Sequence, residues 1–345
     1  MPQQGTNSMH AGRSFSSRIF IKKDALWHSV LFASGCEKLL YPWRVSGRLV
    51  VMYHNVLPDD AAKVNVRQIC QSDFRKQLLY LKKRYTVVSL SDFFLDGGIN
   101  NRIAITLDDG LVNNLRFALP VLEEVQVPAT VFVCTPHLIG QHVLWPDALE
   151  VTCHHLHEPI EFDGEQFLRK GLFHFNQKGE RLVHCIKHLS LDEKWEFIHQ
   201  LAKRMGKKPW EEAQWENHCR VMNAGEIKSL SQSPFIEIGS HCIAHSNLEW
   251  MSDEETLHEL SASKKFLEGI IGKKVVSLAF PDGSYSGRTV ELAQQARYTR
   301  QLAVNLRSSE DHNDSRLAGR YGFYSDRSCT EQLHQMNKFF HYKIS

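Results

Sequence analysis

The chain has 345 residues, of which 42% are apolar and 23% charged, a composition typical of a soluble globular protein. Its 41 basic and 39 acidic side chains leave a net charge of +2. This is not the strong excess of basic residues typical of nucleic-acid-binding proteins, so we do not expect nucleic acid as a partner. The eight cysteines are widely spaced and form no CxxC pair, which favours free thiols in a reducing compartment.

Residues 1–45 are predicted to form an N-terminal extension. Residues 1–17 are rich in Ser, Gly and Gln, which is typical of disorder. The segment from Leu26 to Ala33 is too short and too polar to span a bilayer. We interpret it as a short amphipathic helix that packs on the domain or lies on a membrane surface. A cytoplasmic location is the first expectation, and the faint similarity of residues 33–36 to a lipoprotein cleavage site makes export or peripheral membrane association the alternative.

Seven apolar runs predict strands, over residues 48–53, 85–90, 103–107, 129–133, 235–239, 275–280 and 301–305. Helices are predicted between them: one from Ser72 as N-cap, one over residues 115–125 that Pro120 must bend or interrupt, and one that starts with a capping box at Ser252. This alternation favours a parallel α/β sheet or a TIM-like barrel. Residues 140–222 break the rhythm, and we interpret them as an irregular, mostly helical insertion within a domain over residues 46–345.

Chemically reactive side chains follow four of the predicted strands: His54, Asp108 with Asp109, His241, and Asp282. The C-terminal ends of parallel strands meet at one edge, so these groups are expected to gather there. Asp108 and Asp109 end a buried apolar run, where each ionised carboxylate needs a partner or a metal. Neighbouring strand residues point to opposite faces. We therefore expect one aspartate to hold a metal and the other to act on a water molecule.

His241 and His245 are four residues apart, a spacing that lets both imidazoles face one point on a helical or tightly turned backbone. Two histidines and one carboxylate leave an open coordination position, as in a catalytic zinc site. Cys242 lies between them, either as a sulfur ligand or as a small packed side chain.

Together these segments resemble the polysaccharide deacetylases of carbohydrate esterase family 4, the NodB-homology domain. The segment Thr106-Leu107-Asp108-Asp109-Gly110 matches the family's Thr-Phe-Asp-Asp-Gly motif with Leu107 in place of Phe. The segment from His241 to His245 matches His-Ser/Thr-x-x-His, with Cys242 in place of the hydroxyl residue. Phe280-Pro281-Asp282-Gly283 is similar to the third motif, and the resemblance covers about residues 46–330.

The resemblance implies a distorted (β/α) barrel of about seven parallel strands and a divalent-metal-dependent hydrolase that removes N-acetyl groups from sugars. By position, Asp109, His241 and His245 would hold the metal, expected to be Zn²⁺, and Asp108 would be the base. The backbone N–H of Asp282 would stabilise the oxyanion. Two further segments also look like those of bacterial members, and they make His54 and Tyr53 candidate substrate-binding residues and Arg320 a candidate catalytic residue.

This sequence departs from the family pattern at two places. Ala279 stands where the family has an arginine that orients the base, and Arg320 is the candidate to supply that charge. The family's late Leu-x-His general acid has no clean counterpart, because Leu333-His334 has a helix-like pattern and His312 lies in a polar segment.

Three functions remain open at this point. The first is an N-deacetylase for an N-acetylated polysaccharide, oligosaccharide or glycolipid of cell-envelope or exopolysaccharide metabolism. The missing acid motif favours the second, a carbohydrate-binding relative without turnover. The third is an amidohydrolase for a non-sugar amide, because a fold does not determine its substrate. Trp145, Trp195 and Trp215 of the insertion either stack on sugar rings or pack in a core.

Overall fold

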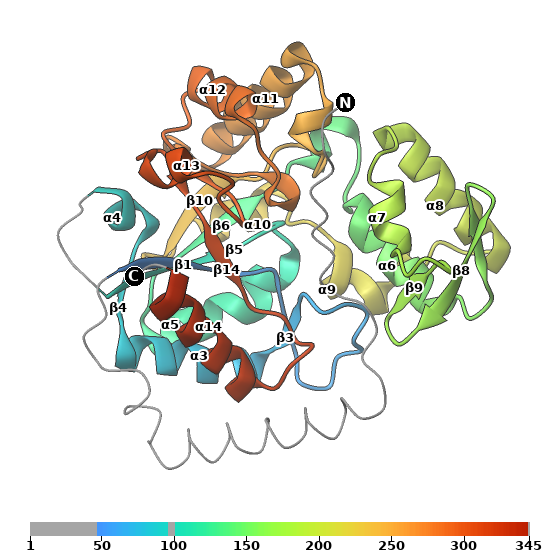
Figure 1. Ribbon diagram of the computed structural model, residues 1–345, viewed down its shortest axis with the longest axis horizontal. Coiled ribbons are helices and arrows are strands. Elements are labelled where there is room, and N and C mark those ends of the chain that lie inside the picture. The colour runs from blue at the N-terminus through green and yellow to red at the C-terminus, as the bar shows by residue number, and fades with distance from the viewer. Residues whose placement is uncertain (1–46, 96–100, 344–345) are drawn as a thin grey trace.

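The computed structural model describes residues 47–95 and 101–343, so the predicted N-terminal extension lies outside the described residues. Their central feature is a sheet of nine strands in which every pair is parallel (Figure 1). The strands are β1 (Arg48–Tyr53), β4 (Thr86–Val88), β5 (Arg102–Leu107), β6 (Ala129–Val133), β10 (Ile236–Ser240), β11 (Ser277–Ala279), β12 (Arg300–Leu302), β13 (Leu317–Ala318) and β14 (Arg320–Gly322). The seven predicted strands are all present, with ends that shift by a few residues, and β13 and β14 were not predicted.

The two outermost strands of this sheet come from one short stretch of chain. The strand order is β13-β12-β11-β10-β6-β5-β1-β14, with β4 beside the first half of β5. Gly319 alone separates β13, which pairs with β12, from β14, which pairs with β1. The sheet therefore curves so strongly that its two outermost strands, β13 and β14, are consecutive in the chain. The predicted parallel α/β architecture of barrel type is confirmed.

Alternate strand residues face two different layers, as the pleat of a strand requires. Leu49, Val51 and Tyr53 of β1 belong to the large cluster between the sheet and its helices. Val50 faces the inside of the curved sheet, in a second cluster with Ala104, Phe132, Ala279, Leu302 and Ala318. Three of these interior side chains are alanines, which leaves space inside the sheet for a longer side chain.

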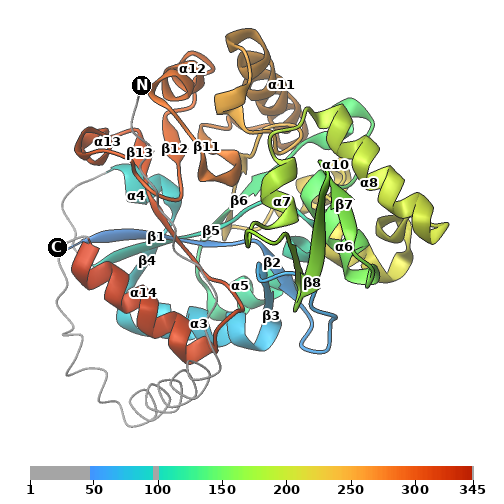
Figure 2. The ribbon, with the colours of Figure 1, turned by 45° about the vertical axis from the view of Figure 1, so that its right-hand side comes forward.

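Helices cover the outer face of the sheet (Figures 1 and 2). The predicted helix at Ser252 is α11 (Asp253–Ile271), with the capping box present, and Pro120 lies in the first turn of α5 (Leu119–Val125), directly after a π-helical turn at Asn114–Ala118. The cap predicted at Ser72 is wrong, because Cys70 is the N-cap of α3 (Gln71–Arg84) and the Ser72 N–H donates to Asp59 instead. The other helices outside the insertion are α4 (Leu90–Leu95), α10 (Ala224–Leu230), α12 (Gly287–Gln295), α13 (Ser309–Asn313) and α14 (Cys329–Lys343), and β2 (Asn55–Leu57) pairs with β3 (Gln68–Cys70).

The predicted insertion packs beside the sheet, on the right-hand side of Figure 1. Its helices are α6 (Trp145–His155), α7 (Leu182–Ile186), α8 (Leu191–Met205) and α9 (Glu216–Cys219). It also contains an antiparallel sheet that was not predicted, formed by β7 (Ile160–Phe162), β8 (Glu165–Lys170) and β9 (Phe173–Phe175). Trp145, Trp195 and Trp215 are buried in the insertion's own hydrophobic cluster, so they are core residues and not platforms for sugar rings.

Two features of the described residues bear on the sequence-based expectations. None of their helices has the length and apolarity needed to cross a membrane. Their cysteines are free: Cys70, Cys134, Cys153, Cys185, Cys219, Cys242 and Cys329.

Candidate active site

Asp108 and Asp109 follow β5, and both are almost completely buried. Their side chains contact different partners. Asp108 Oδ1 accepts a hydrogen bond from Arg320 Nη1 at 2.7 Å. Asp109 Oδ1 lies 3.6 Å from His241 Nε2 and 3.7 Å from His245 Nε2. The two neighbouring carboxylates thus have separate surroundings.

Gly110 makes this turn feasible. Its φ is +69°, and a Cβ built on it would lie 2.8 Å from the Cα of Val133 on the neighbouring strand. A side chain here would meet both an unfavourable backbone conformation and a backbone clash.

Arg320 reaches Asp108 from the inside of the curved sheet. It lies on β14, in register with Val50 of the interior layer, and its side chain is 1% exposed. Ala279, which stands where the family has its arginine, belongs to the same interior cluster. Because Ala279 is small, the interior has room for an arginine that comes from a different strand. The structure thus places the charge of Arg320 against Asp108.

The charge of Arg320 sets the ionisation of Asp108. Burial raises the pKa of this carboxyl group, but the charges of Arg320, His241 and His54 outweigh burial and hold the pKa at about 2. Asp108 is therefore an ionised carboxylate at neutral pH.

His241 and His245 lie at either end of a tight turn after β10. Cys242 and His245 have φ values of +65° and +56°, and this left-handed backbone brings both imidazoles to the same side as Asp109. His241 Nδ1 lies 2.7 Å from the carbonyl oxygen of Ala279 and donates to it, which leaves Nε2 available as a ligand. Cys242 is fully buried in the main core, as a packed side chain.

The surroundings of Asp109 fit a divalent metal. Both of its carboxylate oxygens are buried and have no hydrogen-bond partner in the described part of the chain, and the same holds for the buried His245 Nδ1. Arg67 is a cation close to Asp109, because its Nη1 lies 3.6 Å from Asp109 Oδ2. A buried carboxylate without hydrogen bonds is unfavourable unless a cation balances it. One carboxylate oxygen and two imidazole nitrogens are the donors of a catalytic zinc site.

Cys134 is a further potential ligand in this region. Asp109, Cys134 and His241 bring one ligand atom each within 4.8 Å of one another. However, the Cys134 thiol donates to the carbonyl oxygen of His241 at 3.2 Å. Burial, and next the charge of Asp109, raise the pKa of this thiol well above its usual value, which disfavours the thiolate that binds zinc. We therefore regard Asp109, His241 and His245 as the better metal-binding set.

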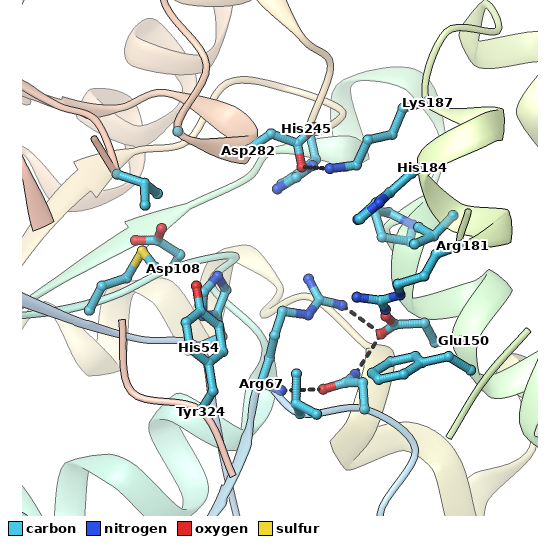
Figure 3. Close-up of a pocket in the computed structure, with 18 of the residues that line it drawn as sticks. His54, Arg67, Asp108, Glu150, Arg181, His184, Lys187, His245, Asp282 and Tyr324 are labelled. Carbon is cyan, nitrogen blue, oxygen red and sulfur yellow. Dashed lines mark hydrogen bonds and ion pairs between the residues drawn. The ribbon is translucent and has the colours of Figure 1, made fainter. Parts of the chain in front are cut away.

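A cavity of about 570 Å³ opens beside these groups (Figure 3). Asp108, His241, His245, Asp282 and Arg320 line it from the sheet, together with His54 after β1. Burial lowers the pKa of His54 to about 4, although the charges of Asp109 and Asp108 act in the opposite direction. Its ring is therefore neutral at pH 7 in the metal-free protein.

The insertion forms the opposite wall of the cavity. Phe173, Phe175, Arg181, His184 and Lys187 line it there, and the sequence analysis singled out none of them. Lys187 Nζ lies 2.6 Å from Asp282 Oδ1, so this wall is tied to the turn of the third motif, where Asp282 has a φ of +59°. Arg67 makes a second connection, because it contacts Glu150 and Asp147 of α6 in addition to Asp109. These contacts join residues that are far apart in the chain, so no local sequence pattern could have predicted them.

The structure corrects the prediction for Tyr53. This side chain packs between Phe74 and Phe323, at ring-centroid distances of 4.9 Å from each, and lies in the main core. Met52 lines the cavity instead. Neighbouring residues of a strand face opposite sides, so Tyr53 faces the helices when Met52 faces the interior.

Comparisons with known proteins bear on the family and the fold of this chain. The family model for polysaccharide deacetylase matches residues 98–300, more than half of the chain. The deacetylase PplD of Streptococcus pyogenes, solved with acetate, is 16% identical with a TM-score of 0.53, over 85% of this chain and 98% of that one. IcaB of Ammonifex degensii is 17% identical with a TM-score of 0.52, over 86% and 98%. At these identities the solved structures show the fold. Curated protein sequences give no match.

Proposed function

The chain belongs to the polysaccharide deacetylase family, and from this premise we propose that it is a metal-dependent N-deacetylase. Its substrate would be an N-acetylated sugar in a polysaccharide, oligosaccharide or glycolipid. The observation that supports this best is the pair of buried carboxylates with different partners, Asp108 against Arg320 and Asp109 against two histidines.

Asp109, His241 and His245 would hold the metal, and the set of one carboxylate and two imidazoles supports Zn²⁺ as the proposed ion. When bound, the ion would polarise the acetamide carbonyl and lower the pKa of a water molecule. Asp108 lines the same cavity and would accept the proton of the attacking water, while Arg320 keeps it ionised and in place. The backbone N–H of Asp282 would stabilise the oxyanion from the third-motif turn.

Breaking the C–N bond requires that the amine nitrogen receive a proton. Leu333 and His334, the weak sequence candidates for the family's acid, lie in α14 and do not line the cavity. His54 lines it, but its low pKa leaves it neutral at pH 7. We therefore assign the proton transfer to Asp108, which takes the proton from water and passes it to the leaving amine. His54 would position the substrate.

Acetate release from N-acetylated chito-oligosaccharides tests the function. We expect release by the wild type and a loss of about 10²–10⁴-fold in kcat for Asp108→Asn. Asp192→Asn, on the exposed surface of α8, is the matched control and should retain full activity. Undiminished release by folded Asp108→Asn would contradict the assignment of the base. Sugar binding without any release by the wild type would identify a non-catalytic relative.

The role of His54 is tested by the choice of leaving group. We expect His54→Gln to lower kcat/KM by a similar factor for the acetamide and for an activated aryl acetate, which needs no proton on its leaving group. A loss much greater for the acetamide would instead make His54 the general acid.

A further inference from the structure

Four cationic side chains line the cavity, and three of them have a carboxylate close by. Arg67 lies 2.8 Å from Glu150, Lys187 lies 2.6 Å from Asp282, and Arg320 lies 2.7 Å from Asp108. The fourth, Arg181, has no carboxylate within 4.0 Å among the described residues, and its Nε is buried without a hydrogen-bond partner. The nearby Glu150 already accepts hydrogen bonds from Arg67 and Asn65.

The insertion holds the Arg181 side chain in place. Its guanidinium carbon lies 3.6 Å from the centre of the Phe173 ring, a close cation–π contact. Its backbone is paired with Phe175 through a β-bridge. Phe173 and Phe175 line the cavity as well, so the guanidinium packs on an aromatic ring at the cavity wall.

An arginine stays charged in proteins, and the buried Nε–H of Arg181 is unfavourable as long as it has no acceptor. The unpaired guanidinium can form two parallel hydrogen bonds with a carboxylate or a phosphate. We propose that Arg181 is the binding residue for an anionic group on the substrate, so that the acetylated sugar or its direct neighbour carries a carboxylate or a phosphate. This inference rests on the proposed function and names its substrate class.

The position of Arg181 separates recognition from reaction. In Figure 3, Arg181 and His184 lie on the wall opposite Asp108 and His54. A substrate whose acetamide reaches Asp108 would therefore present its anionic group at its other end. The aromatic rings beside Arg181 suit the apolar face of a sugar ring.

The test compares three soluble sugars: N-acetylglucosamine, its 1-phosphate, and an N-acetylated disaccharide with a uronate. Binding is measured by calorimetry and turnover by acetate release. The variants are Arg181→Gln, Arg181→Lys and the control Lys203→Gln, an exposed cation of α8 outside the cavity. We expect the wild type to prefer at least one anionic sugar, and Arg181→Gln to reduce the preference ratio about tenfold or more. Arg181→Lys should retain part of the preference, and Lys203→Gln all of it.

The two anionic sugars show whether phosphate or carboxylate is the natural group. Equal wild-type binding of charged and neutral sugars would overturn the proposal, as would an equal loss in Arg181→Gln and Lys203→Gln. Acetate release from neutral sugars without any preference would overturn this inference and leave the deacetylase function intact. Binding of the anionic sugar through Arg181 without acetate release would support the subsite and contradict the function. If Arg181→Gln does not fold, the preference of the wild type for anionic sugars and its change in Arg181→Lys still test the proposal.

Discussion

The two walls of the cavity hold their charges in different ways. The barrel cluster, which comprises Asp108, Asp109, His241, His245 and Arg320, is almost completely buried. The insertion wall, which comprises Phe173, Phe175, Arg181, His184 and Lys187, is more accessible, with His184 exposed and Arg181 half-buried. Buried charges interact strongly with one another, whereas solvent screens exposed ones.

This difference indicates that the two walls of the cavity have different roles. Strand ends hold the barrel cluster in one arrangement, as a reaction centre requires. The insertion wall lies on loops and short elements, which can change among related proteins without disturbing the sheet. We therefore expect changes in the barrel cluster to affect metal binding, chemistry and stability, and changes in the insertion wall to affect substrate choice.

The largest expected effect is on metal content. His245→Ala should lose the tightly bound ion and reduce acetate release at least about 10³-fold, because it removes one of three protein ligands. His184→Ala, on the insertion wall, should keep the metal. Elemental analysis of purified protein measures this directly, with a chelated and reconstituted wild type beside it. Full metal content in His245→Ala would refute the ligand set.

The next effect is on stability. Arg320→Met removes one partner of a buried ion pair, which should lower the free energy of unfolding by about 3–5 kcal/mol. Arg181→Met should change it by less than about 1 kcal/mol, because Arg181 has no ion pair among the described residues. Urea unfolding of both variants beside the wild type gives the two values. A similar loss in the free energy of unfolding for Arg320→Met and Arg181→Met would contradict the difference between the two walls.

A pair of glycines compares the backbone of the two regions. Gly110→Ala should destabilise the protein by about 2–4 kcal/mol, because a positive φ adds to a clash with Val133. Gly179, in the insertion, also has a positive φ of +82°, but its Cβ would meet no atom of the described residues within 4 Å. Gly179→Ala should therefore cost only about 1–2 kcal/mol. If Gly110→Ala lowers the free energy of unfolding no more than Gly179→Ala, then β6 can move away from the added methyl group.

The smallest effect is a pH dependence of the metal-free protein. Burial lowers the pKa of His54 from 6.5 to about 4, so the unfolded chain binds a proton more readily than the folded protein between these values. The stability due to neutral His54 is thus fully present above pH 6.5 and is lost as the pH falls toward 4. His54→Gln should reduce this slope by up to about 1.4 kcal/mol per pH unit. Thermal unfolding of the wild type and of His54→Gln across this pH range measures the difference, and equal slopes for the two proteins would contradict the prediction.

The sequence predicted most of the candidate active site, because its residues come in short motifs at strand ends. Asp108 with Asp109 and His241 with His245 are pairs in which local spacing already limits the geometry. Tyr53 was assigned wrongly because a motif identifies a segment, while the side-chain direction depends on which strand face is the interior. The small antiparallel sheet β7–β9 was missed because its strands are short and carry no clear alternation.

By itself, the sequence determined the parallel α/β architecture and the family resemblance, and it predicted the proposed metal-binding set. All three depend on apolar periodicity and on residues a few positions apart. The tertiary structure alone decided which cation faces Asp108, because Arg320 is 212 positions away and reaches it only through the curved sheet. It also decided that Arg181 and Lys187 face the same cavity as His245. Such contacts depend on how segments far apart in the chain are arranged in the fold, and no local sequence pattern contains that information.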